Sequence, residues 1–185
     1  MTTDAPSPAD VEQVLAASEL LHSPERVAQA YEEMATAITI ALENKNPLVL
    51  AVLVGGLVPA GALMPRLAFP LELDYIHATR YRGEEHGKDV QWLSRPQAQI
   101  SGRTVLIIDD ILDEGFTLNA IVEYCESVGA QRVMTAVLVN KVHDRKVLAA
   151  ADFQGLDVDD RYVFGCGMDY RGYLRNAPGI YALGD

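Results

Sequence analysis

The chain has 185 residues, of which 49% are hydrophobic and 22% charged, and its formal net charge at pH 7 is −11. This length suits one domain with a buried core, and the balance of residue types excludes a wholly disordered chain. The acidic charge argues against nucleic acid as the main partner, because neutralising a phosphate backbone requires a basic surface.

Three further features concern the compartment of the protein. The apolar stretch at 48–64 is interrupted by three glycines and a proline, so it predicts a strand, a turn and a helix instead of a membrane span. Residues 1–8 lack the basic and apolar regions of a signal peptide, so we expect a cytoplasmic protein with no membrane partner. Cys125 and Cys166 are far apart and outside any CxxC pattern, which predicts reduced structural thiols and no zinc site.

Two helices are predicted at the start of the chain. Ser7 begins the first, with a proline next and an aspartate at the capping-box distance, and its apolar face is expected to reach Leu21. Ser23 begins the second, whose apolar residues recur at helical spacing as far as Leu42. Both are interpreted as packing helices.

The next segment predicts two strands and a short helix. Residues 48–54 are a continuous β-rich apolar run, which is typical of a parallel strand buried on both faces. Two glycines then turn the chain into a short helix near 58–67, and another strand is predicted at 71–78. Residues 80–89 are polar and hold two glycines, so we interpret them as a long mobile excursion, with 90–93 as the returning strand.

The second half alternates strand, loop, helix and strand. A buried strand is predicted at 104–108, a loop at 109–115, a helix at 117–128 ended by Gly129, and a strand at 132–139. This order predicts a right-handed parallel crossover and an α/β fold. Because ligands bind at the carboxyl ends of the strands in such sheets, the loops after the three buried strands should converge on one site.

The most informative stretch is residues 105–118, VLIIDDILDEGFTL. A hydrophobic strand ends in Asp109 and Asp110, a third carboxylate and a glycine follow, and Thr117 stands where a helix begins. Carboxylates can bind Mg²⁺ or ribose hydroxyls, and a helix N-terminus binds phosphate, so the stretch predicts a ribose-phosphate site. The sequence has no GxxxxGK[ST] loop and no GxGxxG after a strand. Composition alone leaves open a solvated acidic turn before a helix cap.

Residues 105–118 closely resemble the ribose-phosphate-binding motif of type I phosphoribosyltransferases, in which a hydrophobic strand precedes two acids, two apolar residues, Asp, a small or polar residue, Gly, any residue and Thr. The resemblance implies an α/β fold with a parallel-sheet core, flanking helices, a flexible lid loop and a small base-binding hood. It also implies a single domain over 1–185. Residues 1–45 would form the N-terminal helices and part of the hood, 46–150 the core, and 151–185 the base-recognition segment.

Two other segments resemble the diphosphate-binding parts of the hypoxanthine-guanine branch of this family. Residues 53–56 resemble its diphosphate loop, in which glycines let backbone amides approach the ligand closely. Gly55 and Gly56 match the loop, whereas Val54 stands where Lys is usual. Arg175 matches an arginine that contacts the diphosphate, although an isolated Arg is more often a surface ion-pair member.

The base-recognition and lid segments also resemble this branch. Lys141 matches a lysine that donates to the purine 6-oxo group and so selects 6-oxopurines over adenine. A lone Lys at a strand end is usually solvated, and 162–164 taken alone also fits a short core strand around Phe164. The residues at the matching positions of the purine-binding segment are Tyr162, Val163 and Asp169, and those of the lid are Arg80, which replaces the usual Ser, and Tyr81.

The implied reaction joins hypoxanthine or guanine to 5-phosphoribosyl 1-diphosphate and releases diphosphate. Asp113 is the candidate general base at purine N7, and Mg²⁺ is the expected cofactor that stabilises the leaving diphosphate. The implied ribose-phosphate ligands are Asp109, Asp110, Glu114, Gly115, Phe116 and Thr117, and the implied metal ligands are Asp109, Asp110 and Asp169.

Three other functions remain as alternatives. One is an enzyme of the same fold for xanthine or a pyrimidine, another is a ligand-sensing regulator of the same fold, and a third is a two-carboxylate phosphatase. The acidic charge and the motif around Asp113 disfavour the regulator, and the phosphatase leaves Lys141 unexplained. The expected partners are a 6-oxopurine base and the activated sugar, and the resemblance implies a homodimer or homotetramer.

Overall fold

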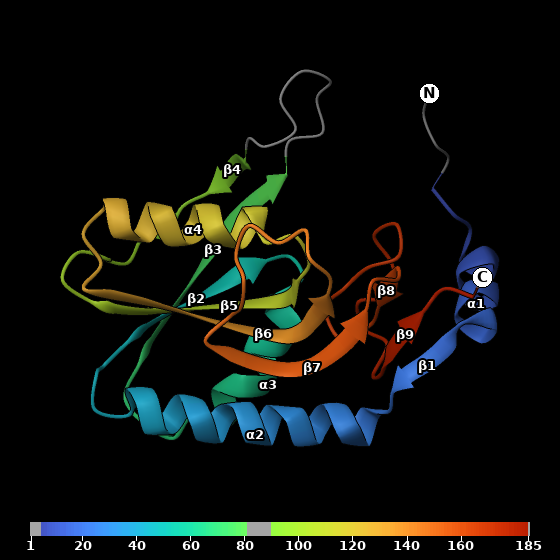
Figure 1. Ribbon diagram of the computed structural model, residues 1–185, viewed down its shortest axis with the longest axis horizontal. Helices are drawn as coiled ribbons and strands as arrows, with labels where there is room; N and C mark the ends of the chain where they lie inside the picture. Colours follow the sequence, from blue (N-terminus) through green and yellow to red (C-terminus); the bar gives the residue numbers. More distant parts are fainter. Residues whose placement is uncertain (1–4, 81–89, 185) are drawn as a thin grey trace.

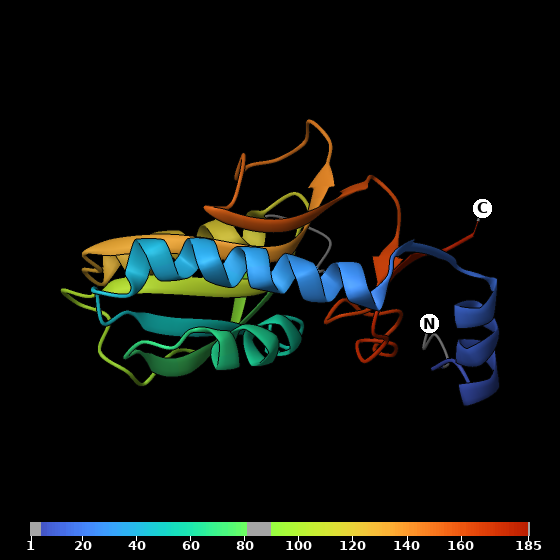
Figure 2. The ribbon, with the colours of Figure 1, turned by 90° about the horizontal axis from the view of Figure 1, so that it is seen from below.

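A computed structural model of the chain describes residues 5–80 and 90–184. It has a large sheet covered by helices on both faces and a small second sheet at one end (Figures 1 and 2). Among the described residues, no helix combines the length and apolar character needed to cross a membrane. The elements are α1 (Pro8–Ala17), β1 (Glu19–His22), α2 (Pro24–Leu42), β2 (Leu48–Leu53), α3 (Leu57–Leu63), the 3₁₀ helix η1 (Met64–Arg66), β3 (Glu72–Arg80), β4 (Val90–Ser94), β5 (Thr104–Leu112), α4 (Phe116–Ser127), β6 (Arg132–Val142), β7 (Phe153–Asp159), β8 (Val163–Phe164) and β9 (Ile180–Ala182).

The large sheet has the strand order β4-β3-β2-β5-β6-β7. The pairs β3–β2, β2–β5, β5–β6 and β6–β7 are parallel. β4 pairs antiparallel with β3 at one edge of the sheet. From β2 the chain first adds β3 on one side and later β5 on the other, so the strand order reverses between β2 and β5. A parallel α/β sheet binds its ligand at such a switch point. The predicted α/β fold with a mostly parallel sheet is confirmed.

Apolar side chains alternate between the two faces of the central strands and build two cores. Val49 and Ala51 pack with α2 and α3, whereas Leu48 and Leu50 face the opposite core, which α4 covers (Figure 1). Because both faces of β2 and β5 are buried, these strands are continuously apolar, as the sequence indicated. Cys125 and Cys166 are buried free thiols, and burial raises the pKa of each to about 11.

The small sheet corrects the prediction for the first helix. The helix ends at Ala17, and the next residues form β1, which pairs antiparallel with β9; the register places Leu20 opposite Tyr181. The prediction from local apolar spacing was wrong here, because strand pairing with residues far along the chain outweighs a weak helical preference. β8 completes this sheet, its Phe164 is fully buried, and the carboxyl ends of β6 and β7 point toward it (Figure 1).

β5 and β6 extend three or more residues beyond their predicted ends, so the first half of the predicted loop at 109–115 is wrong. The extensions are stabilised by strand pairing, since Leu112 of β5 lies opposite Asn140 of β6, and Lys141 of β6 lies opposite Val158 of β7. β7, which forms the other edge of the large sheet, was not predicted.

The remaining predicted elements agree with the structure to within about two residues at most ends, and Asn140 and Lys141 lie inside β6. The lid prediction falls mainly outside the described residues. The backbone of Arg80 ends β3, whereas Tyr81 and the rest of the excursion to residue 89 lie outside the described ranges.

Candidate active site

A cleft of about 360 Å³ opens at the carboxyl ends of β2 and β5 and reaches the start of α4. The loops that follow these two strands converge here, as the sequence predicted. Residues at the end of β3, including His77 and Thr79, form another wall that was not predicted. The predicted site residues that line the cleft are Val54, Gly55, Asp109, Asp110, Asp113, Glu114, Gly115, Phe116, Thr117 and Arg175.

The two glycines after β2 have different surroundings. A Cβ atom on Gly55 would lie 1.9 Å from Asp110 Oδ2, so only glycine allows the chain to pass this carboxylate. A Cβ on Gly56 would lie 2.5 Å from the Ile108 carbonyl oxygen, and the Gly56 amide donates to the Val52 carbonyl oxygen at 2.8 Å. Of the two glycines, Gly55 lines the cleft, whereas the Gly56 amide is already used in the turn.

Two adjacent carboxylates form the floor of the cleft at the end of β5. Burial, and next the charge of Asp110, raise the pKa of Asp109 well above its ordinary range, and burial also raises the pKa of Asp110. Arg175 partly offsets this negative charge, since its Nη1 is 3.8 Å from Asp110 Oδ2 and its Nη2 is 2.7 Å from Asp169 Oδ1. Arg175 and Asp169, which are far from Asp110 in the sequence, are therefore part of the same site.

The start of α4 forms the other end of the cleft. Gly115 is the N-cap residue with φ +83°, and no side-chain cap hydrogen bond covers this helix start. Phe116 and Thr117 follow in the first turn and line the cleft. A 12-residue helix with its positive end directed at a cleft favours an anion such as phosphate.

A second hollow of about 210 Å³ adjoins the cleft. Asp110, Ile111 and Asp113 line both spaces, so a ligand can extend from one into the other. The Tyr162 hydroxyl donates to the Asp169 carbonyl oxygen at 3.0 Å, which orients the ring at the rim. The second hollow contains all four predicted purine-binding residues, Lys141, Tyr162, Val163 and Asp169.

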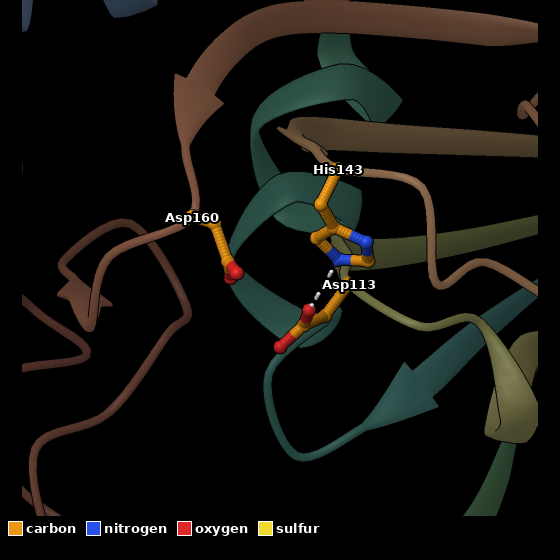
Figure 3. A group of neighbouring side chains, drawn as sticks. All are labelled: Asp113, His143 and Asp160. Carbon is orange, nitrogen blue, oxygen red and sulfur yellow. Dashed lines mark hydrogen bonds and ion pairs between the residues drawn. The ribbon is translucent and has the colours of Figure 1, made fainter.

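Asp113 lies at the junction of the two spaces and has two basic neighbours. Lys141 Nζ is 3.0 Å from its Oδ2, and His143 Nε2 is 2.9 Å from its Oδ1 (Figure 3 shows the histidine contact). Burial alone would raise the pKa of Asp113, but the hydrogen bonds from His143 and Lys141 outweigh burial and lower it. Asp113 is therefore a carboxylate at neutral pH and can accept a proton.

Two sets of side chains could hold a cation. Asp113, His143 and Asp160 place one ligand atom each within 4.8 Å of one another (Figure 3). Lys141 Nζ lies 3.0 Å from Asp113 and 3.8 Å from Asp160, so an ammonium group already offsets part of the negative charge of this set. Asp109, Asp110 and Asp169 supply oxygen ligands, which Mg²⁺ prefers, and their only described cationic contact is Arg175. Among the described residues, only the first set brings three ligand atoms within 4.8 Å of one another.

Sequence reasoning did not identify His143 or Asp160. His143 follows Lys141 by two residues, and β6 runs to Val142, so the period-two alternation of a strand was the available signal. Using that signal required knowing where β6 ends, and the apolar run predicted an end three residues too early. Asp160 follows β7, which was not predicted.

Comparisons with known proteins agree on one family. The family model described as "Phosphoribosyl transferase domain" matches residues 16–171. The chain is 31% identical over 175 residues to the hypoxanthine-guanine phosphoribosyltransferase of Bacillus subtilis, covering 94% of each chain. It is 33% identical over 165 residues to the bifunctional protein TilS/HprT of Listeria innocua, of which it spans only 26%. A hypoxanthine phosphoribosyltransferase crystal structure from Staphylococcus aureus superposes with a TM-score of 0.87 at 27% identity, covering 96% of this chain and 97% of that one.

Proposed function

This chain belongs to the phosphoribosyltransferase family, and we propose that it is a purine-salvage enzyme that converts hypoxanthine or guanine and 5-phosphoribosyl 1-diphosphate into IMP or GMP and diphosphate. The observation that carries the proposal is the pair of adjoining spaces that share Asp110, Ile111 and Asp113. One space offers a helix start and acidic groups, and the other offers a lysine and an exposed tyrosine ring. A sugar phosphate and a planar base joined at the shared wall match this arrangement.

The larger cleft would bind the activated sugar. Its 5′-phosphate would lie at the start of α4, between Glu114 and Thr117, where helix amides and the threonine hydroxyl can donate. Asp109 and Asp110 would hold the ribose hydroxyls. The diphosphate would lie near Gly55, whose missing side chain leaves room for close backbone approach, and near Arg175.

The smaller hollow would bind the base. Lys141 is a donor without an acceptor atom, so it can bind the 6-oxo oxygen of hypoxanthine or guanine but not the 6-amino group of adenine. Tyr162 would stack on the ring, because half of its surface is exposed at the rim of the hollow. Val163 is buried beside it and would place its backbone at the edge of the base.

Asp113 would act as the general base. In the reaction the purine N9 forms a bond to C1′ of the sugar, the bond from C1′ to the diphosphate oxygen breaks, and the N7 proton moves to the Asp113 carboxylate. Lys141 contacts Asp113 in the structure, so binding of a 6-oxopurine would move this ammonium group from the carboxylate toward O6. That exchange would make Asp113 Oδ2 available to the proton at N7.

Magnesium is the proposed cofactor, held by carboxylates among Asp109, Asp110 and Asp169. When bound, it supplies positive charge that stabilises the departing diphosphate. The support for this assignment is the excess of carboxylates over guanidinium groups at this end of the site.

We further propose that the enzyme acts in the cytoplasm as a homodimer or homotetramer. Two free, buried cysteines fit a reducing compartment. Exposed apolar side chains on α3 and β3, among them Leu57, Leu73 and Tyr75, support self-association.

An assay of the purified chain tests the activity. The activated sugar and Mg²⁺ are supplied with hypoxanthine, guanine, xanthine, adenine or uracil in separate reactions, and nucleotide and diphosphate are measured together. We expect equal amounts of nucleotide and diphosphate with hypoxanthine and guanine. Preference for xanthine or uracil would support the alternative enzymes of the same fold, and no turnover with any base would support the regulator.

A further inference from the structure

His143 contacts the general base proposed above and is itself almost fully buried. Its side chain is 4% exposed, whereas Asp113 and Lys141 are 45% and 13% exposed. His143 Nε2 lies 2.9 Å from Asp113 Oδ1, and Figure 3 shows the ring directed at the carboxylate. The contact joins the segment just after β6 to the turn between β5 and α4, 30 residues apart in the chain.

The hydrogen bond made by His143 Nδ1 determines whether Nε2 donates to Asp113 or accepts from it. The backbone N–H of Arg145 donates to His143 Nδ1 at 3.2 Å, so Nδ1 acts as an acceptor and carries no proton. A neutral imidazole then has its proton on Nε2, which makes Nε2–H the donor to Asp113 Oδ1. Arg145 is in turn held by an ion pair with Asp160 of 2.7 Å. This chain of contacts gives the imidazole one tautomer and one direction.

The two oxygens of Asp113 therefore have separate partners. Oδ2 accepts from Lys141 and Oδ1 accepts from His143. If a 6-oxopurine takes Lys141 away, as the proposed function requires, Oδ2 loses its partner while Oδ1 keeps its hydrogen bond. The carboxylate then stays in a fixed orientation with Oδ2 directed at the base.

We propose that His143 is a positioning residue for the transfer reaction, which holds the Asp113 carboxylate through a neutral Nε2–H donor so that the opposite oxygen receives the purine N7 proton. The inference rests on the proposed function. A fixed carboxylate matters because proton transfer requires hydrogen-bond distance to the reacting proton, and small displacements of a catalytic group are costly.

A metal-binding role for His143 explains the contacts less well. Such a role would need Asp113 and Asp160 as further ligands, yet Lys141 lies beside both. It would also leave the Arg145 amide as a second, unrelated contact on the ring. The charged groups around the Asp113–His143 pair are Glu114, Lys141, Arg145, Lys146 and Asp160, and they are unchanged in the variants below.

The test compares His143→Leu with His143→Gln. Leucine removes the donor, so we expect kcat to fall about 10- to 100-fold, the range for losing a hydrogen bond to a charged group, with KM for the activated sugar within about twofold. Glutamine can direct an N–H at Asp113, so His143→Gln should recover most of the lost kcat. Losing the donor raises the pKa of Asp113, so the acidic limb of kcat/KM should move to higher pH in His143→Leu alone.

His22→Leu is the matched control. His22 also uses Nε2 for a hydrogen bond of 2.9 Å, but to the Asp157 carbonyl oxygen and outside both spaces. It should change thermal stability without changing the pH limb. A His143→Leu enzyme with the kcat and pH limb of the wild type would overturn the proposal while leaving the proposed function intact.

A measurement on the wild-type protein separates the geometry from the activity. Nitrogen-15 NMR of the histidine rings, with the His143 signals identified by their loss in His143→Gln, reports which nitrogen carries the proton. We expect a protonated Nε2 and an unprotonated Nδ1 at neutral pH. The opposite tautomer would overturn the positioning role even in an active enzyme, and a wild type with no transferase activity would overturn the function and this role together.

Discussion

Substitution of Gly55 by alanine is the sharpest test of how the cleft is built. A Cβ atom there would lie 1.9 Å from Asp110 Oδ2 and 2.4 Å from Asp110 Cγ, well inside contact distance. Gly55 is not among the glycines with positive φ, so the backbone tolerates alanine and the entire penalty comes from space. Asp110 cannot retreat easily, because it is buried, with 8% of its surface exposed.

The expected magnitude follows from overpacking a buried site. Inserting one methyl group into a tight position costs about 1–3 kcal/mol, which lowers the Tm of a domain of this size by about 2–12 °C. Displacing Asp110 by about 1 Å should lower kcat/KM for the activated sugar by about 100-fold. Both values are measured on the purified protein, by thermal unfolding and by steady-state kinetics with hypoxanthine.

Gly61→Ala is the matched control for this substitution. Gly61 lies in α3, and a Cβ atom there would meet nothing within 4 Å. Alanine should raise the Tm by about 1–4 °C, because it replaces glycine inside a helix, and should leave the kinetics unchanged. Equal Tm and equal kcat/KM for Gly55→Ala and the wild type would refute the close packing of the cleft floor.

Three further predictions concern the charged groups. Asp113→Asn should lower kcat about 10²- to 10⁴-fold with little change in KM, since the general base is lost while the shape is kept; unchanged turnover in a steady-state assay would exclude Asp113 as the base. Lys141→Ala should raise KM for hypoxanthine and guanine about tenfold or more and reduce their preference over adenine, measured with each base in turn; an unchanged base preference would place the purine elsewhere. Asp109→Asn, measured without Mg²⁺, should raise the Tm at pH 8 because it removes a buried carboxylate whose pKa is raised. The folded wild type binds this proton more tightly than the unfolded chain does, so the wild type gains stability as pH falls and the advantage of Asp109→Asn should shrink toward acidic pH; a constant advantage at all pH values would contradict the raised pKa.

The motif at 105–118 could be predicted from the sequence because all of its parts are close together in the chain. A buried strand, paired acids and a helix start follow one another within 14 residues, and hydrophobic pattern and turn residues specify each of them. The structure keeps this order and places the motif at the sheet's switch point. The resemblance of Lys141, Tyr162 and Asp169 to a purine site also led to residues that line one hollow.

The ends of the strands were less predictable. β5 and β6 continue past their apolar runs because neighbouring strands supply hydrogen-bond partners. Asp109 lies opposite Val137 of β6, and Asn140 lies between Leu112 of β5 and Asp157 of β7. β1 was read as helix for the same reason, since its partner β9 lies about 160 residues away. Pairing energy depends on which strands meet, and local spacing does not contain that information.

The α/β class, the motif at 105–118 and the residues that resemble a purine site could all be recognised in the amino-acid sequence, because each depends on short-range pattern. Tertiary structure alone decided that Gly55 passes against Asp110, that Arg175 bridges Asp110 and Asp169, and that His143 donates to Asp113. These contacts join residues 30 to 65 positions apart in the chain, except for Asp169 and Arg175, which are six positions apart. Their distances arise from the way the large sheet, the helices and the small sheet pack together, so only the folded chain defines them.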